Sequence, residues 1–145
     1  MTYPAHVILR FDLERAAISG DLNMADLPLA WNEGLQKLLG ITPPSDRDGC
    51  LQDIHWSMGG LGYFSTYSIG NLNSAQLFAA ATTDDGISSE CSRANYLPLL
   101  AWMREHIHAA GSTKLPQELM LSATGERTNP SFYLKHLRSR FCQGD

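Results

Sequence analysis

The chain has 145 residues, of which 43% are hydrophobic and 18% are charged. This length is sufficient for one domain with a sizeable core, and the composition is typical of globular proteins. The formal net charge of −4 argues against a nucleic-acid-binding protein, because such proteins present basic surfaces that neutralise phosphates. We therefore expect residues 1–145 to form a single unit that binds no nucleic acid.

The sequence indicates neither a membrane protein nor a secreted one. The longest apolar runs, such as Leu77–Ala81, are far shorter than the roughly 20 residues that cross a bilayer. Charged side chains interrupt the first apolar stretch, which is not typical of a secretory signal. The cysteines form no Cys-x-x-Cys pair, which favours a reducing compartment; they are Cys50, Cys91 and Cys142. We expect a soluble, cytoplasmic protein.

Two helices are predicted in the first 40 residues. Apolar residues recur at helical spacing from Pro4 to Ser19, with proline suited to a first turn and Gly20 to the C-terminal stop. Asp26 is expected to cap a second helix that ends at Gly40, with an apolar stripe formed by Leu27, Trp31, Leu35 and Leu38.

The rest of the chain also indicates helices. Turn-forming residues from Pro43 to Gly49 and the glycines from Gly59 to Gly62 predict irregular structure. A third helix is expected from Tyr67 to about Thr83, ended by Asp84-Asp85-Gly86. Three more are predicted over Arg93–Ala110, Pro116–Ala123 and Pro130–Arg140. Because no alternating β-branched run with hairpin turns occurs, the predicted fold class is all-α, with about six helices.

Hydrogen-bonding side chains are densest in the segment GCLQDIHW, residues 49–56. Gln52, Asp53 and His55 lie within four residues, and a glycine-rich turn and two tyrosines, Tyr63 and Tyr67, follow. Several polar groups around one titratable ring are typical of part of an active site. The rest of the chain contains no obvious metal-ligand set or nucleophile that would complete such a site.

Several segments carry a family resemblance. The most specific is Gly-x-x-Gln-Asp-x-His-Trp at residues 49–56, followed by Gly-Tyr-Phe-x-Thr-Tyr at 62–67. The others are HVILRFDLE at 6–14, ISGDL at 18–22, Leu-x-x-Ala-Trp-Asn at 27–32, ATGE at 123–126 and Asn-Pro at 129–130. With these segments the chain resembles the C-terminal third of the thermostable, Taq-type metallocarboxypeptidases. The resemblance covers nearly the whole chain and implies part of a larger helical metallopeptidase fold.

The resemblance also implies a divalent metal, zinc or cobalt, held by a His-Glu-x-x-His helix and a downstream Glu. No His-Glu-x-x-His occurs in the sequence, and the pair His106-x-His108 has a spacing that does not share one helix face. The family's Arg-containing motif for the substrate carboxylate is absent as well. We therefore expect a C-terminal fragment of a longer carboxypeptidase, binding no metal and inactive alone, whose parent removes single residues from peptide C-termini.

The resemblance further implies roles for individual residues. In the related helical zinc peptidases of the thimet and angiotensin-converting type, a His and a Tyr face the metal, so His55 is expected to stabilise the oxyanion. Tyr63 or Tyr67 is expected to assist it, and the spacing does not decide between them. The other residues of this segment expected to bind substrate or to orient His55 are Gln52, Asp53, Gly59 and Gly60, the glycines by allowing close backbone approach.

His6, Arg10 and Glu14 lie on one stripe of the first predicted helix and have two interpretations. The first is a surface ladder of weak ion pairs. The second is that Arg10 lines the cleft and holds the peptide's C-terminal carboxylate, for which a guanidinium is well shaped. Both interpretations stay open at the level of the sequence.

Each site residue also has a structural interpretation. His55 could be a core histidine bonded to Asp53, and the two tyrosines could be packing aromatics. Other histidines, His106, His108 and His136, are expected to be solvated. Two further functions are considered: a non-enzymatic helical interaction module that keeps only the peptidase scaffold, and a hydrolase in which His55 activates Cys50 as nucleophile.

A fragment would expose surfaces that faced the missing part of its parent. Apolar surfaces of that kind are commonly covered by another chain, so we expect self-association as a homodimer. The residues expected near the contact are Trp31, Trp56, Tyr63 and Phe64.

Overall fold

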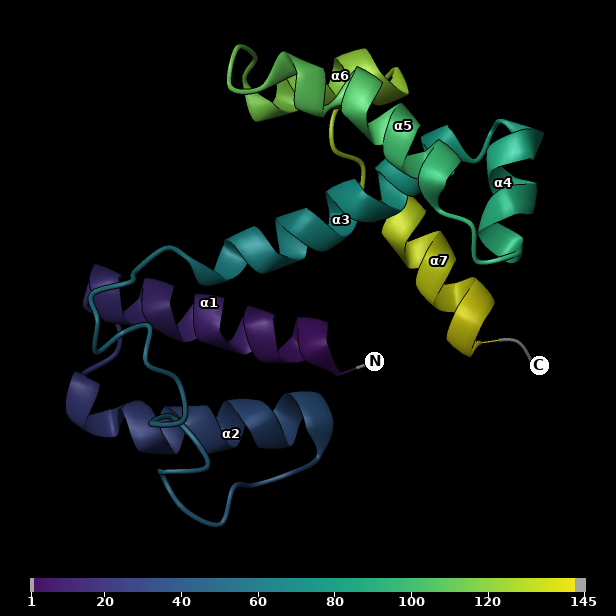
Figure 1. The fold of residues 1–145 in the computed structure, drawn as a ribbon. Coiled ribbons are helices and arrows are strands. Elements are labelled where there is room, and N and C mark those ends of the chain that lie inside the picture. Colours follow the sequence, from purple (N-terminus) through teal and green to yellow (C-terminus); the bar gives the residue numbers. More distant parts are fainter. Residues whose placement is uncertain (1, 143–145) are drawn as a thin grey trace. The chain divides into compact units, whose positions relative to one another are not determined.

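The computed structural model describes residues 2–142, which contain helices and irregular segments but no strand. Seven α-helices follow one another (Figure 1): α1 Tyr3–Ser19, α2 Leu27–Leu39, α3 Phe64–Ala81, α4 Asp85–Ser92, α5 Leu97–His106, α6 Pro116–Thr124 and α7 Ser131–Phe141. Short 3₁₀ turns, Met24–Asp26 and His108–Ala110, precede α2 and follow α5. None of these helices is both long and apolar enough to span a membrane. The predicted all-α class is confirmed, with one helix more than expected.

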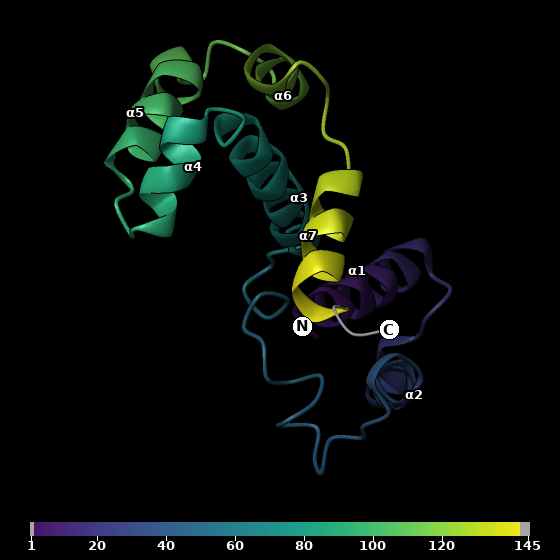
Figure 2. The same ribbon diagram turned by 90° about the vertical axis from the view of Figure 1, so that its right-hand side faces the viewer.

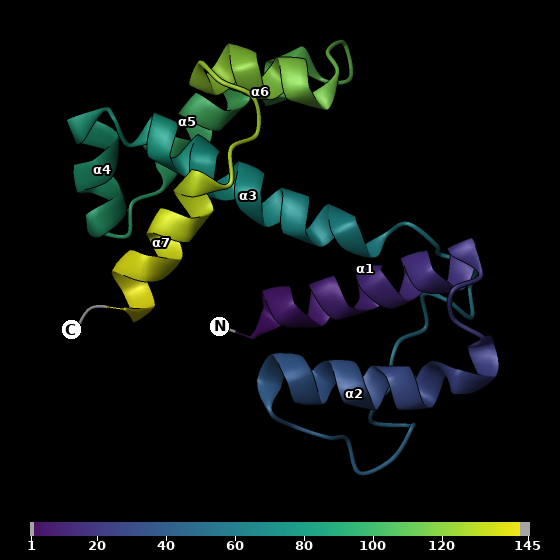
Figure 3. The same cartoon turned by 180° about the vertical axis from the view of Figure 1, so that it is seen from behind.

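The chain divides into two compact units, Met1–Ser68 and Ile69–Asp145. In the first unit α1 and α2 lie side by side and run in opposite directions, as both the front and the rear view show (Figures 1 and 3). In the second unit α4 and α5 lie side by side (Figure 2). That residues 1–145 make one domain stays a prediction.

The core of the first unit lies between α1 and α2. Its buried cluster includes one residue of the loop that follows α2 and consists of Leu9, Leu13, Leu27, Trp31, Leu35 and Cys50. Gly34 lets the two helices approach closely, because a Cβ at that position would clash with Leu9 Cδ1. Burying one large apolar side chain stabilises a fold by about 1.5–3 kcal/mol. The interface between α1 and α2 is therefore a stable support for the loop that follows α2.

The ends of α1 and α2 follow the sequence signals, with one exception. Gly20 and Gly40 adopt the left-handed conformation at φ 84° and 70° and end the two helices, as predicted. Asp26 stands at the N-cap position of α2 as predicted, but its side chain makes no capping hydrogen bond. The chain enters α2 through the 3₁₀ turn, with Asp26 in near-helical geometry. Asn23 before that turn is extended, and its side chain accepts a hydrogen bond from Ala25 N.

The aspartates after α3 begin a helix that the sequence analysis missed. Asp84 Oδ1 accepts hydrogen bonds from the backbone N–H of Gly86 at 2.7 Å and of Ile87 at 3.3 Å. This N-cap satisfies donors that a helix start leaves without intrahelical partners, so α4 follows where only a break was expected. The next helix begins at Leu97 rather than Arg93, because Ala94 takes a positive φ of 61° and interrupts the helical backbone.

One buried amide organises the second unit. Gln76 of α3 is fully buried, and its Nε2 lies 2.7 Å from Thr124 Oγ1 and 3.1 Å from the carbonyl oxygens of Glu126 and Arg127. Its Oε1 accepts a hydrogen bond from Asn129 N at 2.8 Å. Both ends of the amide are therefore paired, and the irregular segment between α6 and α7 is held against α3.

We predict that replacing Gln76 with Leu lowers the free energy of unfolding by about 3 kcal/mol, because several buried polar groups then lose their partner. Urea unfolding followed by circular dichroism measures this change. Gln36→Leu is the matched control, since Gln36 is exposed and its Oε1 bonds only Thr42 among the described residues. Equal effects of the two substitutions would contradict the assigned role.

Candidate functional site

The candidate site is the irregular segment between α2 and α3, where two glycines and one backbone bond close a tight turn. Gly59 and Gly62 adopt positive φ values of 75° and 76°. Gly60 N donates to His55 O at 2.7 Å, and a Cβ on Gly60 would lie only 3.0 Å from that oxygen. Gly60 is thus required for the close approach that folds the chain back beneath His55.

Aromatic side chains surround His55. Its ring stacks on Tyr63 at 5.8 Å and packs against Phe64 at 4.8 Å between centroids. Its Nε2 lies 3.4 Å from the hydroxyl of Tyr67, while its Nδ1 is buried without a hydrogen-bond partner among the described residues. The structure therefore brings together the predicted histidine and both candidate tyrosines.

The phenol of Tyr67 stays protonated well into the alkaline range. Desolvation raises its pKa, and the neighbouring Tyr63 and Tyr3 raise it further. The Tyr67 ring packs edge-to-face against the Tyr63 ring at 5.2 Å and the Tyr3 ring at 6.3 Å. A protonated hydroxyl beside His55 remains a hydrogen-bond donor at neutral pH.

The interpretation of His55 as a core histidine bonded to Asp53 is wrong, because His55 Nε2 contacts Tyr67 and its Nδ1 has no hydrogen-bond partner among the described residues. The Asp53 carboxylate pairs with Arg10 instead. Arg10 Nε lies 2.5 Å from Asp53 Oδ2. The loop residue Gln52 is exposed and Asp53 is half-buried. The binding roles predicted for Gln52, Asp53, Gly59 and Gly60 stay predictions.

Arg10 is buried, with 7% of the residue exposed. Its Nη1 donates to His6 O at 2.9 Å, and its guanidinium carbon lies 4.7 Å from the Trp31 ring centroid. A second ring, that of Phe64, lies 5.7 Å away. The interpretation of a surface ladder is therefore wrong for Arg10, since a flat charged group is enclosed between aromatic faces and paired with Asp53.

Glu14 is buried too, and the sequence analysis did not identify it as a site residue. Its Oε1 accepts a hydrogen bond from Gly62 N at 2.6 Å, and 4% of the residue is exposed. The carboxylate lines an apolar pocket of about 280 Å³ together with Trp56 and Leu61. Only its position one helical turn after Arg10 could have drawn attention to it, because its partner lies 48 residues away.

Cys50 lies in the core of the first unit, where burial raises the pKa of its thiol and nearby Asp46 raises it further. This environment disfavours the thiolate that nucleophilic catalysis requires. Trp31 and Phe64 are also buried, so neither side chain is exposed for a contact with another chain, and the expected self-association stays a prediction. Tyr63 has 49% of its surface exposed.

The remaining histidines form no metal site with other side chains. His108 and His136 are exposed as predicted, but His106 is half-buried and stacks on Trp102 with ring centroids 4.4 Å apart. Among residues 2–142, no three His, Cys, Asp or Glu side chains gather in a geometry that could hold a metal ion.

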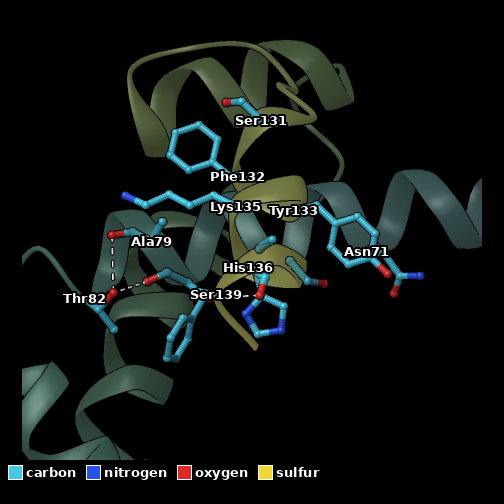
Figure 4. A pocket seen from close by; sticks show the side chains of 12 residues that line it. Asn71, Ala79, Thr82, Ser131, Phe132, Tyr133, Lys135, His136 and Ser139 are labelled. Atoms are coloured by element: carbon cyan, nitrogen blue, oxygen red, sulfur yellow. Dashed lines mark hydrogen bonds between the residues drawn. The ribbon is translucent and has the colours of Figure 1, made fainter. Parts of the chain in front are cut away.

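A separate crevice of about 810 Å³ lies within the second unit, between α3 and α7 (Figure 4). Phe78 of α3 and Phe132 and His136 of α7 line it. The hydroxyl of Thr82 donates to carbonyl groups of its own helix, and that of Ser139 donates to His136 O. These two hydroxyls are therefore used locally. The other polar side chains that line the crevice are Asn71, Ser74, Ser131, Tyr133, Lys135 and His136.

Comparison with known proteins identifies close relatives. Residues 1–141 match the family described as carboxypeptidase Taq (M32) metallopeptidase. Thermostable carboxypeptidase 1 of Pyrococcus furiosus is 40% identical over 142 residues, which are 97% of this chain and 28% of that protein. Carboxypeptidase 1 of Bacillus subtilis is 36% identical over the same shares of the two chains.

Solved structures of carboxypeptidases are also similar to this chain. The M32 carboxypeptidase from Deinococcus radiodurans R1 has a TM-score of 0.91 and 42% identity, over 97% of this chain and 29% of that one. Trypanosoma cruzi metallocarboxypeptidase 1 has a TM-score of 0.91 and 38% identity, over 97% and 30%. The chain thus spans less than a third of the length of these relatives. On the match over residues 1–141, the chain belongs to the carboxypeptidase Taq (M32) metallopeptidase family.

Proposed function

We propose that this chain is the C-terminal, substrate-side part of a metal-dependent carboxypeptidase that removes single residues from the C-termini of peptides. The family membership and the names of the relatives support this activity for a longer parent protein. By itself the chain is proposed to be inactive. Its contribution is a set of hydrogen-bond donors next to the reacting carbonyl group.

The observation that carries the proposal is the arrangement of His55 and Tyr67. Hydrolysis of a peptide bond creates negative charge on the carbonyl oxygen, and fixed donors aimed at that oxygen are usually a large part of catalysis. Tyr67 Oη lies 3.4 Å from His55 Nε2, so a hydroxyl and an imidazole nitrogen lie within one small region. In the tautomer that carries its proton on Nε2, both groups are donors. The aromatic rings that pack on His55 reduce its contact with water, which strengthens such hydrogen bonds.

Tyr67 is the better supported of the two tyrosines. Its hydroxyl is the one that lies beside the imidazole of His55, whereas Tyr63 packs its ring flat against the imidazole. We therefore assign oxyanion stabilisation to His55 and Tyr67, with Tyr63 orienting the imidazole by stacking.

The metal belongs to the proposed parent rather than to this chain. The described residues do not fit a zinc or cobalt ion, since they contain no group of three suitable ligands. In the proposal, the ligands lie in the larger part of the relatives that this chain does not match. The residues discussed here act on the substrate and its oxyanion, without contacting the ion.

We also propose a cytoplasmic location, a homodimer, and binding of peptide substrates by their C-terminal ends, with no binding to nucleic acid or membranes. The free thiols of Cys50, Cys91 and Cys142 support a reducing compartment. The exposed aromatic side chain of Tyr63 supports a covered surface near the site. The alternative function is an interaction module that keeps the scaffold without catalysis.

We predict that His55→Ala in the natural full-length protein carrying this sequence lowers kcat by about 10²–10³-fold with little change in KM, because the donor acts in the transition state. Tyr67→Phe should lower kcat by roughly 10-fold, and Tyr63→Phe less. Release of the C-terminal residue from a blocked dipeptide, with zinc and with cobalt, measures both parameters.

Exposed residues of the same types serve as controls, namely His108→Ala and Tyr96→Phe. Unchanged kcat in the His55 variant would remove the oxyanion role. If the full-length wild-type protein neither binds metal nor releases an amino acid, the interaction module becomes the better hypothesis.

We predict that Cys50 in the folded protein reacts with iodoacetamide at pH 8 at least about 10-fold more slowly than Cys142, because its raised pKa keeps the buried thiol protonated. Mass spectrometry of digested samples gives the rate at each cysteine, and unfolding in guanidinium should equalise the rates. Faster labelling of Cys50 than of Cys142 would revive a nucleophilic role, as would loss of activity in a folded Cys50→Ala variant.

A further inference from the structure

The segment that carries His55 is tied to α1 at both of its ends. At one end Asp53 pairs with Arg10, and at the other Gly62 N donates to Glu14. Arg10 and Glu14 lie one helical turn apart on the same face of α1. We propose that these two residues are the positioning residues of the site, which fix the 53–62 segment and thereby hold His55 in its working position.

Hydrogen bonds within the segment do not provide this attachment. The backbone bonds Met58 N to Ile54 O, Gly59 N to Trp56 O, Gly60 N to His55 O and Leu61 N to Gly59 O are all internal to it. They fix the shape of the turn and leave its place on the helices undetermined. The contacts that fix its place include the two side chains of α1 and the packing of Trp56 on Trp31, with ring centroids 6.2 Å apart. Phe64 of α3 also packs against Trp56, at 5.8 Å between centroids, and against His55.

Arg10 is suited to positioning and poorly placed to bind a substrate. Its Nε is used by Asp53 and its Nη1 by His6 O, and the guanidinium lies between the Trp31 and Phe64 rings. A buried arginine that lacked its carboxylate would carry an uncompensated charge, so Asp53 is held firmly. His55 follows Asp53 by two residues and is displaced if Asp53 moves.

Glu14 performs the same task at the other end. A buried carboxylate is costly to desolvate, and among the described residues its one hydrogen bond goes to the backbone of Gly62. Gly62 is followed directly by Tyr63, whose ring stacks on His55, and by Phe64, which begins α3. Glu14 therefore sets where the chain leaves the turn and where the aromatic wall of the site begins.

This inference rests on the proposed function, because a positioning role needs a reaction in which His55 takes part. It differs from the sequence-based hypothesis that Arg10 holds the substrate carboxylate. Loss of a ground-state contact to substrate raises KM, whereas displacement of an oxyanion donor lowers kcat. The two roles are therefore separated by the same kinetic measurement.

The test uses the natural full-length protein with Arg10→Met and Glu14→Leu, each alone and combined with His55→Ala. We expect each single variant to lower kcat by about 10–100-fold with KM changed less than about 3-fold, as small displacements of catalytic groups do. In the His55→Ala background the same substitutions should lower kcat no further, because they act through His55. Glu14→Gln keeps an acceptor oxygen for Gly62 N and should restore most of the activity.

A second measurement needs no activity. Hydrogen–deuterium exchange of the peptide covering residues 55–63 should accelerate at least about 10-fold in Arg10→Met and Glu14→Leu, since the segment loses an attachment. Arg15→Met and Glu33→Ala are the matched controls, because both residues are exposed on α1 and α2, and they should leave exchange unchanged. If the Arg10→Met and Glu14→Leu variants fail to fold, the milder substitutions Arg10→Lys and Glu14→Gln allow the same comparison.

The outcomes separate the two proposals. An Arg10→Met variant with raised KM and unchanged kcat overturns the positioning role and restores the carboxylate-binding one. Losses that add fully to that of His55→Ala also overturn it, as does unchanged exchange in folded variants. Failure of the proposed function is recognised independently, because His55→Ala itself then leaves kcat unaltered.

Discussion

The first unit depends on a buried charge. Arg10 lies between the Trp31 and Phe64 rings and pairs with Asp53, so one side chain of α1 contacts α2, the loop and the first turn of α3. Taking a guanidinium out of water is costly, and the ion pair and the aromatic faces offset that cost with little net gain in stability. The arrangement instead fixes the relative positions of four successive segments, which are α1, α2, the loop that follows α2 and the first turn of α3.

The positions of Glu14, of the glycine-rich turn and of His55 follow from this arrangement around Arg10. A turn of 3.6 residues places Glu14 beside Arg10, so a second anchor meets the loop at Gly62 without any additional element. Positive φ values at Gly59 and Gly62 and the close contact of Gly60 with His55 O then fold the chain between the anchors. His55 is thereby presented on an irregular segment that is attached to rigid helices, as precise sites require.

The sequence predicted the parts of this structure that depend on local chemistry. Glycines end α1 and α2 as expected, and the His55 segment was identified from its own residues and family motif. The sequence analysis predicts that Asp84 ends a helix, whereas in the structure it caps the start of α4. Aspartate is common at both kinds of position, and no local rule distinguishes them before the following helix is known. The contacts of Arg10 with Asp53 and of Glu14 with Gly62 were not predicted, because these partners lie 43 and 48 residues away and helical spacing says nothing about them.

The two units hold irregular segments in different ways, and the difference indicates where function lies. Gln76 uses a neutral amide whose donors and acceptor are all paired, an arrangement that stabilises the second unit at small desolvation cost. The first unit uses a buried cation and a buried carboxylate for the same task, although neutral side chains would hold a loop more cheaply. Under the proposed function, the charged anchors hold the segment that carries the catalytic imidazole of His55, whereas the neutral amide of Gln76 holds a segment whose role is to stabilise the fold.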